Sequence, residues 1–384
     1  MKNKFKAFLF LQFGALGLWG PYLPLALFNK HYSGIQIGLL LGTMPIVVMI
    51  LQPVWSYLSD RLNTRKNLLM ASCLGMGITM IGIGLADSFV TTMVWTVLFS
   101  VLWAPLNPIG TAMMLEALEE TGELGKFSLI RLWGSIGFGV TSLLGGILLI
   151  DRFIDHMIWM AGGMYILLGL TSFFLPEKRA AIHFAQEKPS QILAGNPRLL
   201  FYLLGSVFVG ATLGINNNHI TLFLESLHAQ DWLVGLTVSL QAFVEVPLML
   251  ITPWILRHRS QRWVILTGAL LLPLRWLLYL LIKSPVWLAP IQIFHGVVVV
   301  SFYVVGISFV DQLVDLRWRA TGQGLYFMAV NGIGVAFGSY LAGVAFEWFG
   351  IRSVWYLNTL LNLIGVVFLL ITFYRYHDQH AGKM

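Results

Sequence analysis

Charged side chains are scarce in this chain of 384 residues: Asp, Glu, Lys and Arg together make up 11% of it. A soluble domain carries about 25% charged residues, so this scarcity excludes an ordinary soluble fold. Cysteine is nearly absent, and because Cys73 is the only one, no internal disulfide can form. No His, Cys or carboxylate spacing typical of a metal site or a hydrolytic centre is present. We therefore expect no metal, no cofactor and no enzyme activity.

An excess of positive charge does not point to nucleic acid here. The chain has 24 Lys and Arg against 17 Asp and Glu, a formal net charge of +7. These basic residues fall in short stretches between apolar runs rather than on one patch, so we expect no nucleic-acid partner.

Apolar runs dominate instead, with 57% hydrophobic residues and a mean hydropathy of +0.78. Each run is long enough to cross a hydrocarbon core of about 30 Å. Because lipid offers the backbone no hydrogen-bond partners, each run should be a helix. The first run continues without a cleavage site and predicts a membrane helix rather than a signal peptide. The twelve runs fall at 5–28, 34–58, 67–86, 90–115, 127–150, 157–175, 198–225, 232–256, 262–282, 286–311, 322–348 and 353–376.

Basic residues predict the orientation of these spans. Nineteen of the 24 lie on the side of the two termini, Arg275 lies inside a span, and four lie on the other side: Lys30, Arg152, Lys283 and Arg352. Cytoplasmic loops carry the excess of Lys and Arg, so both termini should be cytoplasmic. We expect a multi-pass protein of the cytoplasmic (inner) membrane.

A polar connection at 176–197 divides the spans into six and six. It predicts an N-terminal six-helix bundle over 1–175 and a C-terminal six-helix bundle over 198–384. Pro53-Val-Trp55 and Pro253-Trp254, each followed by a short basic loop, recur about 200 residues apart and indicate an internal repeat. Two such halves are the layout of many secondary transporters.

Three ionisable residues lie inside successive spans of the C-terminal half: Glu245, Arg275 and His295. A charge inside the membrane costs about 2.5–3.5 kcal/mol on insertion scales, so it needs a partner or a water-filled cavity. The three could form a buried proton-coupling network. They could equally be a static salt bridge that ties three helices together. Gln241, four residues before Glu245, shares its helix face.

Other polar and aromatic residues are candidates for contact with a substrate. The spans contain Trp19, Asn107, Asn217 and His219, besides Gln241. Asparagines suit hydroxyl groups, whereas tryptophan can stack on a ring. The two histidines could also be satisfied polar residues with no role in binding.

Arg131 stands at the start of a glycine-rich span that holds Gly134, Gly137, Gly139, Gly145 and Gly146. Small residues allow another helix to approach closely in lipid. Arg131 could bind substrate beside this span, or it could be a cytoplasmic anchor that only marks topology.

The loop after the second span resembles a loop motif of the major facilitator superfamily, Gly-x-x-x-Asp-Arg-x-Gly-Arg-Arg. Here it begins at Ser56 and contains Asp60, Arg61 and, after one extra residue, Arg65. The resemblance extends over the whole chain through its twelve spans and central connection. It implies the two-bundle fold of that superfamily, with Asp60, Arg61 and Arg65 as a cytoplasmic gate.

Within the superfamily, the stretch Arg131-Leu-Trp-Gly-Ser-Ile-Gly resembles the fifth span of 3-phenylpropionate permease-like proteins. It is more distantly similar to that of lactose permease-like proton symporters. Glu245, Arg275 and His295 match that lineage's glutamate, arginine and histidine. The resemblance implies substrate binding by Arg131 and proton coupling by the other three. Thr111 stands near the place where the relatives carry an acid, so the carboxylate partner of Arg131 stays open.

We therefore expect a proton-coupled symporter of a small organic solute that works by alternating access, more consistent with a sugar or nucleoside than with other solutes. An aromatic carboxylate symporter and a drug/proton antiporter are the alternatives within transport. A membrane enzyme or a receptor without flux is the alternative outside it. Expected partners are the solute, protons and the bilayer, with the chain as a monomer.

Overall fold

The computed structural model describes residues 2–62, 65–123, 126–176, 193, 195–315 and 318–375. Every regular element in these ranges is helical. Twelve helical stretches are long and apolar enough to cross a membrane, and their ends lie within five residues of the predicted runs. The expectation of an all-α membrane protein with twelve transmembrane helices is confirmed.

The chain forms two compact units. Unit 1 comprises Met1–Phe184 and His228–Phe243, and unit 2 comprises Ala185–Leu227 and Val244–Met384. Helix α10 (Asp231–His258) therefore contributes its first part to unit 1 and its second part to unit 2. Most of the predicted connection at 176–197 lies outside the described residues, so the predicted division at that segment stays a prediction.

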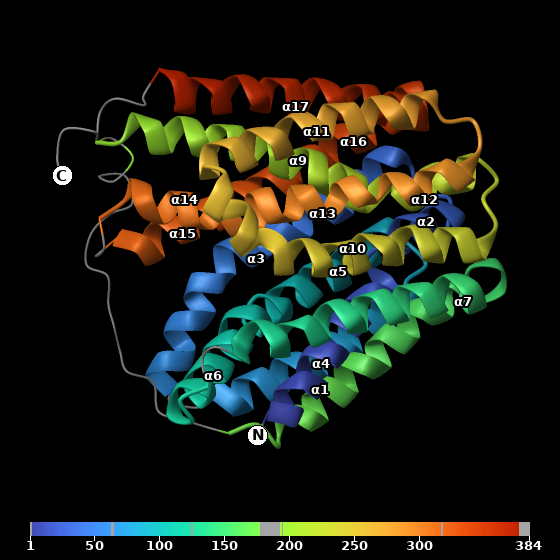
Figure 1. The fold of residues 1–384 in the computed structure, drawn as a ribbon. Helices are drawn as coiled ribbons and strands as arrows, with labels where there is room; N and C mark the ends of the chain where they lie inside the picture. The colour runs from blue at the N-terminus through green and yellow to red at the C-terminus, as the bar shows by residue number, and fades with distance from the viewer. Residues whose placement is uncertain are drawn as a thin grey trace. The chain divides into compact units, whose positions relative to one another are not determined.

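Unit 1 holds the helices from α1 to α7 together with the start of α10 (Figure 1). Their bounds are α1 (Lys2–Trp19), α2 (Leu23–Asn29), α3 (Gly34–Leu62), α4 (Arg65–Leu85), α5 (Phe89–Trp103), α6 (Leu106–Glu120) and α7 (Phe127–Ser172). Helix α7 contains two membrane spans, Leu129–Leu148 and Ile154–Ser172. Its ribbon turns back on itself between them in Figure 1.

Glycine and hydroxyl side chains bring α1 and α7 together. A Cβ added to Gly137 of α7 would clash with the backbone oxygen of Phe10, so the two backbones lie in close contact. Thr141 of α7 donates a hydrogen bond to the backbone oxygen of Gly14, at 2.8 Å, and Ser142 donates one to that of Gly17, at 3.2 Å. Small residues and interhelical hydrogen bonds hold helices together where lipid supplies no hydrophobic drive. The glycine-rich span thus serves close packing, as its sequence predicts.

Prolines interrupt two spans of unit 1. The first span is divided into α1 and α2 around Gly20, Pro21 and Tyr22, and the fourth into α5 and α6 around Ala104 and Pro105. Proline removes one helical hydrogen bond and clashes with the preceding turn. The breaks place Asn107 at the start of α6, on the exposed surface of unit 1.

Ion pairs fix the start of α1. Glu123, after α6, accepts hydrogen bonds from Lys126 and from Lys2. These two cations lower the pKa of Glu123 to about 2. The link therefore stays charged at neutral pH and joins α1 to the connection that precedes α7.

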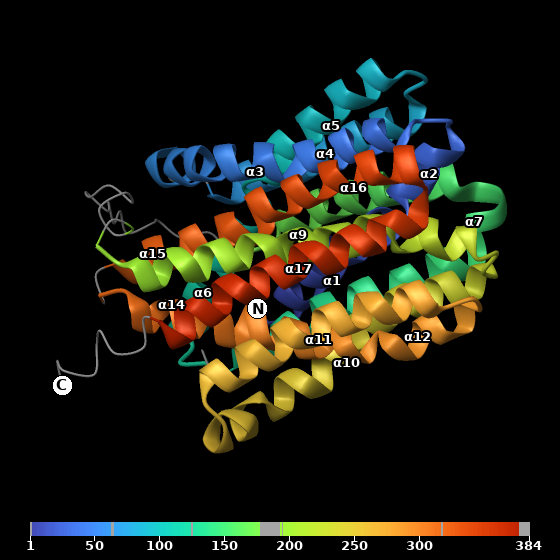
Figure 2. The ribbon, with the colours of Figure 1, turned by 90° about the horizontal axis from the view of Figure 1, so that it is seen from above.

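Unit 2 contains α9, the second part of α10 and all later elements. Helix α9 packs against α16 and α17 (Figures 1 and 2). The bounds are α9 (Pro197–Ser226), α11 (Gln261–Leu281), η2 (Pro285–Trp287), α12 (Leu288–Ile291), α13 (Ile293–Val299), η3 (Val300–Val305), α14 (Gly306–Leu313), α15 (Arg319–Phe327), η5 (Met328–Gly334), α16 (Val335–Phe349) and α17 (Ile351–Tyr374).

Two segments of unit 2, η3 and η5, are π-helical turns within longer spans. Such turns leave backbone groups without regular helical partners and often occur at functional sites. Tyr326 donates a hydrogen bond to the backbone oxygen of Phe302 in η3 at 2.7 Å. Tyr303 of η3 donates one to Asn331 of η5 at 2.8 Å. The second bond ties the two irregular turns to each other, and the first ties η3 to α15, the helix that precedes η5.

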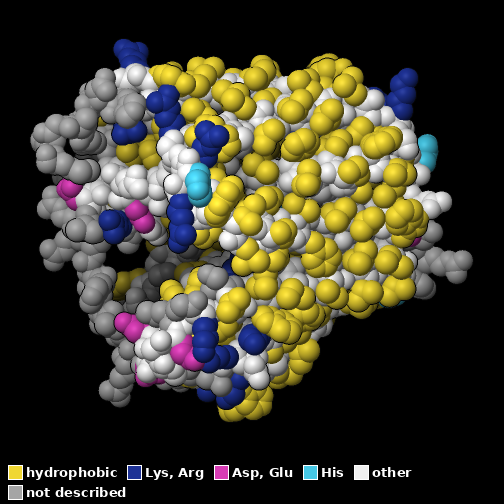
Figure 3. Space-filling view, viewed as in Figure 1, with side chains coloured by type: hydrophobic (Ala, Val, Ile, Leu, Met, Phe, Trp, Pro, Cys, Tyr) yellow, Lys and Arg dark blue, Asp and Glu magenta, His cyan; other side chains and the backbone are white. Residues whose placement is uncertain are grey.

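The surface has the character of a membrane protein. On the face that Figure 3 shows, apolar side chains cover the surface over α11 and α17, and Lys and Arg gather toward the left end of these helices. Exposed residues of α11 and α17 include Leu274, Leu277 and Val367. This apolar surface is what contact with lipid tails requires.

Candidate functional site

The predicted network lies within unit 2. Its three side chains form a row, in the order Glu245, His295 and Arg275. Glu245 Oε1 lies 3.3 Å from His295 Nε2. On the other side of the same ring, His295 Nδ1 lies 3.3 Å from Arg275 Nη1. Imidazole therefore stands between the acid and the permanent cation, and the acid does not touch the cation directly.

The hydrogen bonds assign the proton on the imidazole. A guanidinium can only donate, so His295 Nδ1 must accept the bond from Arg275. The ring proton then sits on Nε2 and points to Glu245. In this arrangement His295 is neutral, and its N–H is a donor to an acceptor carboxylate. A proton taken up by Glu245 would change this bond first.

Arg275 has only neutral hydrogen-bond partners. It is fully buried, and Nη2 donates to Gln292 at 2.5 Å and to Tyr279 at 3.2 Å. Among the residues that the structure describes, no carboxylate lies within 4.0 Å of this guanidinium. Its positive charge is thus hydrogen-bonded but not neutralised by direct contact.

Gln292 holds this arrangement in one orientation. Its amide nitrogen donates to the backbone oxygen of Leu288 at 2.7 Å and to Tyr279 Oη at 2.9 Å, while its oxygen accepts from Arg275. Tyr279 passes the chain on to Asn216, at 3.4 Å. The network therefore links α11, α12 and α9.

Local sequence explains why these groups meet. Pro273 lies in α11 two residues before Arg275, and Pro247 lies in α10 two residues after Glu245. The tenth span begins as the short pieces η2, α12 and α13, and the backbone N–H of His295 bonds to Gln292 at 2.9 Å. The spacing Gln292-x-x-His295 places both side chains on one helix face. Sequence reasoning missed Gln292 and Tyr279, although this spacing was the signal available.

The predicted substrate residues of unit 2 have different environments. Asn217 is exposed in the middle of α9, whereas His219 is fully buried, with Nδ1 3.2 Å from the backbone oxygen of Ile215. Among the described residues, the Nε2 atom of His219 finds no hydrogen-bond partner. Asn218 donates to Ser339 at 2.8 Å. Of the two predicted residues, Asn217 alone is exposed, so that a solute could contact it.

Unit 1 contains the other substrate candidates. Arg131 is exposed, and its guanidinium lies 4.2 Å from the centre of the Phe13 ring. Asn107 accepts a hydrogen bond from buried Gln12 at 2.5 Å. A polar group exposed inside a membrane span is costly against lipid and indicates a polar pathway.

Trp19 and Gln241 are buried in unit 1. The Trp19 indole donates to Tyr165 at 2.9 Å and its ring packs edge-on against Phe99 and Trp103. These contacts engage the indole N–H and the ring of Trp19 within the packing of unit 1.

Of the three predicted gate residues, the structure describes the side chain of Arg65 alone. Arg65, at the start of α4, is nearly buried and forms an ion pair with Glu116 of α6. The side chains of Asp60 and Arg61 lie outside the described residues. Within the described part of the chain, no group of three or more His, Cys, Asp or Glu residues could hold a metal ion.

Comparison with known proteins gives a consistent result. The model of the MFS_1 like family matches residues 3–357. The chain is 25% identical to "Uncharacterized transporter YwbF" of Bacillus subtilis (94% of this chain, 90% of the relative). It is 27% identical to the maltose permease of Geobacillus stearothermophilus (100% and 96%) and 24% identical to the xanthosine permease of Escherichia coli (91% and 89%).

Among solved structures, the nucleoside transporter NupG superposes with a TM-score of 0.85. The match covers 97% of this chain and 99% of the other at 20% identity. This likeness shows the fold alone.

Proposed function

The chain belongs to the MFS_1 like family, whose members are transporters of the major facilitator superfamily, and on that premise we propose that it is a proton-coupled symporter of a sugar or a nucleoside. As a member of this family, it is a multi-pass membrane transporter rather than an enzyme. We place it in the cytoplasmic membrane with both termini inside. The two units would alternate in opening to either side of the membrane.

The position of Glu245 inside a membrane span is the observation that supports proton coupling. It lies near the middle of the span Asp231–His258, whereas every other carboxylate described within a span lies about one helical turn or less from a span end. Its side chain is 20% exposed and contacts the neutral N–H of His295. A carboxylate that is both inside the membrane and partly open can exchange a proton.

In the proposed cycle, Glu245 is protonated when the transporter opens outward and binds the solute. Release of the proton toward the cytoplasm lets the carboxylate accept again from His295. His295 stands between Glu245 and Arg275, and one imidazole ring separates the carboxylate from the guanidinium. Gln292 and Tyr279 keep Arg275 in position throughout.

The relatives and the exposed polar groups support a solute that carries hydroxyl groups. Maltose permease and xanthosine permease act on the solutes that their names state, both rich in hydroxyl groups. Exposed Asn107 and Asn217 could bind such groups. An aromatic carboxylate is the second candidate, because Arg131 is exposed beside the Phe13 ring and could bind both the acid and the ring.

The direct test is a pH measurement in lightly buffered proteoliposomes offered sugars, nucleosides and aromatic acids in turn. Symport predicts that one solute class raises the external pH as protons enter with it. Acidification outside would indicate proton antiport, and binding without any flux would indicate a receptor. Either outcome overturns the proposal.

Replacement of Glu245 by Gln tests the coupling role. We expect Glu245→Gln to abolish accumulation driven by a pH gradient while solute exchange continues at a reduced rate. Glu225→Gln is the matched control, since Glu225 is exposed at the end of α9. Full accumulation by Glu245→Gln, or equal loss in both variants, would contradict the assignment.

A further inference from the structure

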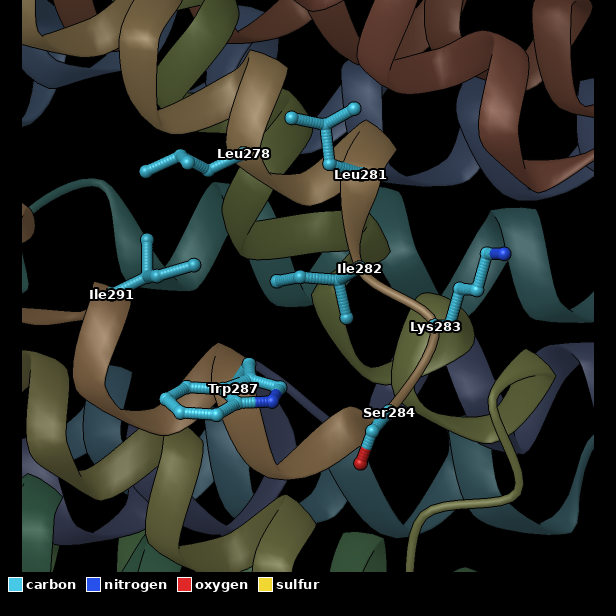
Figure 4. A pocket seen from close by; sticks show the side chains of 7 residues that line it. All are labelled: Leu278, Leu281, Ile282, Lys283, Ser284, Trp287 and Ile291. Carbon is cyan, nitrogen blue, oxygen red and sulfur yellow. The ribbon is translucent and has the colours of Figure 1, made fainter.

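A pocket of about 520 Å³ opens on the surface of unit 2 where α11 ends and η2 begins. Figure 4 shows Leu278, Leu281, Ile282 and Ile291 around it, with the Trp287 ring along one side. Its volume is within the range of small-molecule pockets, about 300–1,000 Å³. Its walls are almost entirely apolar, so they offer nothing to hold the hydroxyl groups of a sugar.

Position in the chain places this pocket at the membrane surface. One membrane span ends at Leu281 and the next begins at Pro285. The apolar walls therefore belong to the ends of two spans, and Lys283 and Ser284 belong to the connection between them. Tryptophan at such a boundary sits at the level of the lipid headgroups, as Trp287 would, being 65% exposed.

Two cations stand at the same end of α11. Lys283 is exposed at the pocket, and Arg352 of α17 donates to the backbone oxygens of Leu280 at 3.2 Å and Ile282 at 3.4 Å. Among the described residues, neither has a carboxylate within 4.0 Å. A guanidinium has five donors, so Arg352 keeps three after these bonds. Two positive charges therefore stand here without a described carboxylate in direct contact.

The groove is apolar and ends in two cations at the level of the lipid headgroups. A molecule that fits it must have an apolar chain and an anionic headgroup. We propose that this pocket binds a phospholipid with an anionic headgroup. One acyl chain occupies the groove along Leu278 and Ile291. The phosphate lies at the Lys283 ammonium, and the Ser284 hydroxyl donates to it. A zwitterionic lipid has the same acyl chains but no net negative charge, so Lys283 and Arg352 would attract it less.

The pocket backs onto the Arg275 network. Leu278 and Ile291 line the groove, while their chain neighbours Tyr279 and Gln292 bind Arg275 in the interior. An acyl chain between α11 and α12 would fix the spacing of the two helices that hold the guanidinium. Lipid occupancy would therefore stabilise unit 2 from its outer surface, whatever solute is transported.

Binding is measured on the purified full chain by native mass spectrometry, with phosphatidylglycerol and phosphatidylcholine of identical acyl chains. We expect one retained phosphatidylglycerol per chain. Lys283→Gln should weaken its binding about fivefold, as loss of about 1 kcal/mol per cation implies, and leave phosphatidylcholine unchanged. Lys4→Gln is the matched control, because Lys4 is exposed on α1.

A second variant, Leu278→Trp, fills the groove and keeps both cations, and it should lose both lipids. Equal phosphatidylglycerol binding by Lys283→Gln and Lys4→Gln would overturn the proposal. So would competition by inorganic phosphate at the lipid concentration, since the site would then take phosphate rather than lipid. The readout is binding, so failure here leaves the symport proposal untouched.

Discussion

At the scale of single residues, the unusual feature is a fully buried arginine whose direct partners are all neutral. A buried charge without an adjacent counter-ion depends on well-placed hydrogen bonds. Gln292 supplies one such bond and also fixes Tyr279. The amide thus acts as a positioning group for the cation.

Removal of this amide should cost stability. We expect Gln292→Ala to lower the free energy of unfolding by about 1.5–3 kcal/mol, the range for a hydrogen bond to a charged group. The thermal unfolding midpoint in detergent would measure the loss. Gln230→Ala is the control, because the Gln230 side chain is exposed and accepts a hydrogen bond from the Trp232 indole, away from any buried charge. Equal midpoints for the two variants would refute the positioning role.

Sequence alone could predict the acid, the imidazole and the guanidinium, because charges inside apolar spans are conspicuous. It did not single out Gln292 or Tyr279, although Gln292 lies three residues before His295. Tyr279 of α11 and Gln292 at the end of α12 become partners of Arg275 only through the packing of these helices. Nor could it tell that His219 is fully buried while Asn217, two residues earlier, is exposed. Exposure within a span depends on packing, and periodicity alone does not fix it.

At the scale of elements, close packing of glycines sets the positions of the helices. Gly137 of α7 touches the backbone of Phe10, whereas a Cβ placed on Gly163 of the same helix meets no described atom within 4 Å. The same substitution should therefore have different effects at the two positions.

Gly137→Ala should destabilise unit 1 by about 1–3 kcal/mol, the usual cost of overpacking. Gly163→Ala should have little effect, since the added methyl group meets open space. Thermal unfolding of both variants in the same detergent compares them. A stable Gly137→Ala protein would mean that α1 and α7 can separate without cost.

Hydropathy predicted where the spans are, and the structure confirms all twelve. It did not predict that the first and fourth spans each break at a proline, or that π-helical turns interrupt the tenth and eleventh. Length and apolarity are averages over a span. A break depends on the local partners that satisfy the freed backbone groups, as Tyr326 does for Phe302.

At the scale of the whole molecule, the distribution of basic residues predicts which side each connection faces. One span, Gln261–Leu281, separates Arg257 from Lys283, so the two must face opposite sides of the membrane. Cys73, the only cysteine, is fully buried and gives no background in labelling.

In intact cells, an impermeant maleimide should label Lys283→Cys, on the predicted outer side. It should label Arg257→Cys only after the membrane is permeabilised. Both native side chains are exposed, so neither substitution should disturb folding. The opposite pattern would reverse the orientation and place the termini outside.

The isolation of Arg275 from any adjacent carboxylate among the described residues has a consequence for how voltage acts on this transporter. When Glu245 is ionised, the row Glu245–His295–Arg275 carries no net charge; when Glu245 is protonated, it carries one positive charge. In the proposed symport cycle, this row would carry no net charge while the empty carrier returns and one positive charge while the loaded carrier moves inward. A potential of 100 mV, negative inside, acts on one charge with about 2.3 kcal/mol. The membrane potential would thus drive the inward movement of the loaded carrier and would not oppose the return of the empty one.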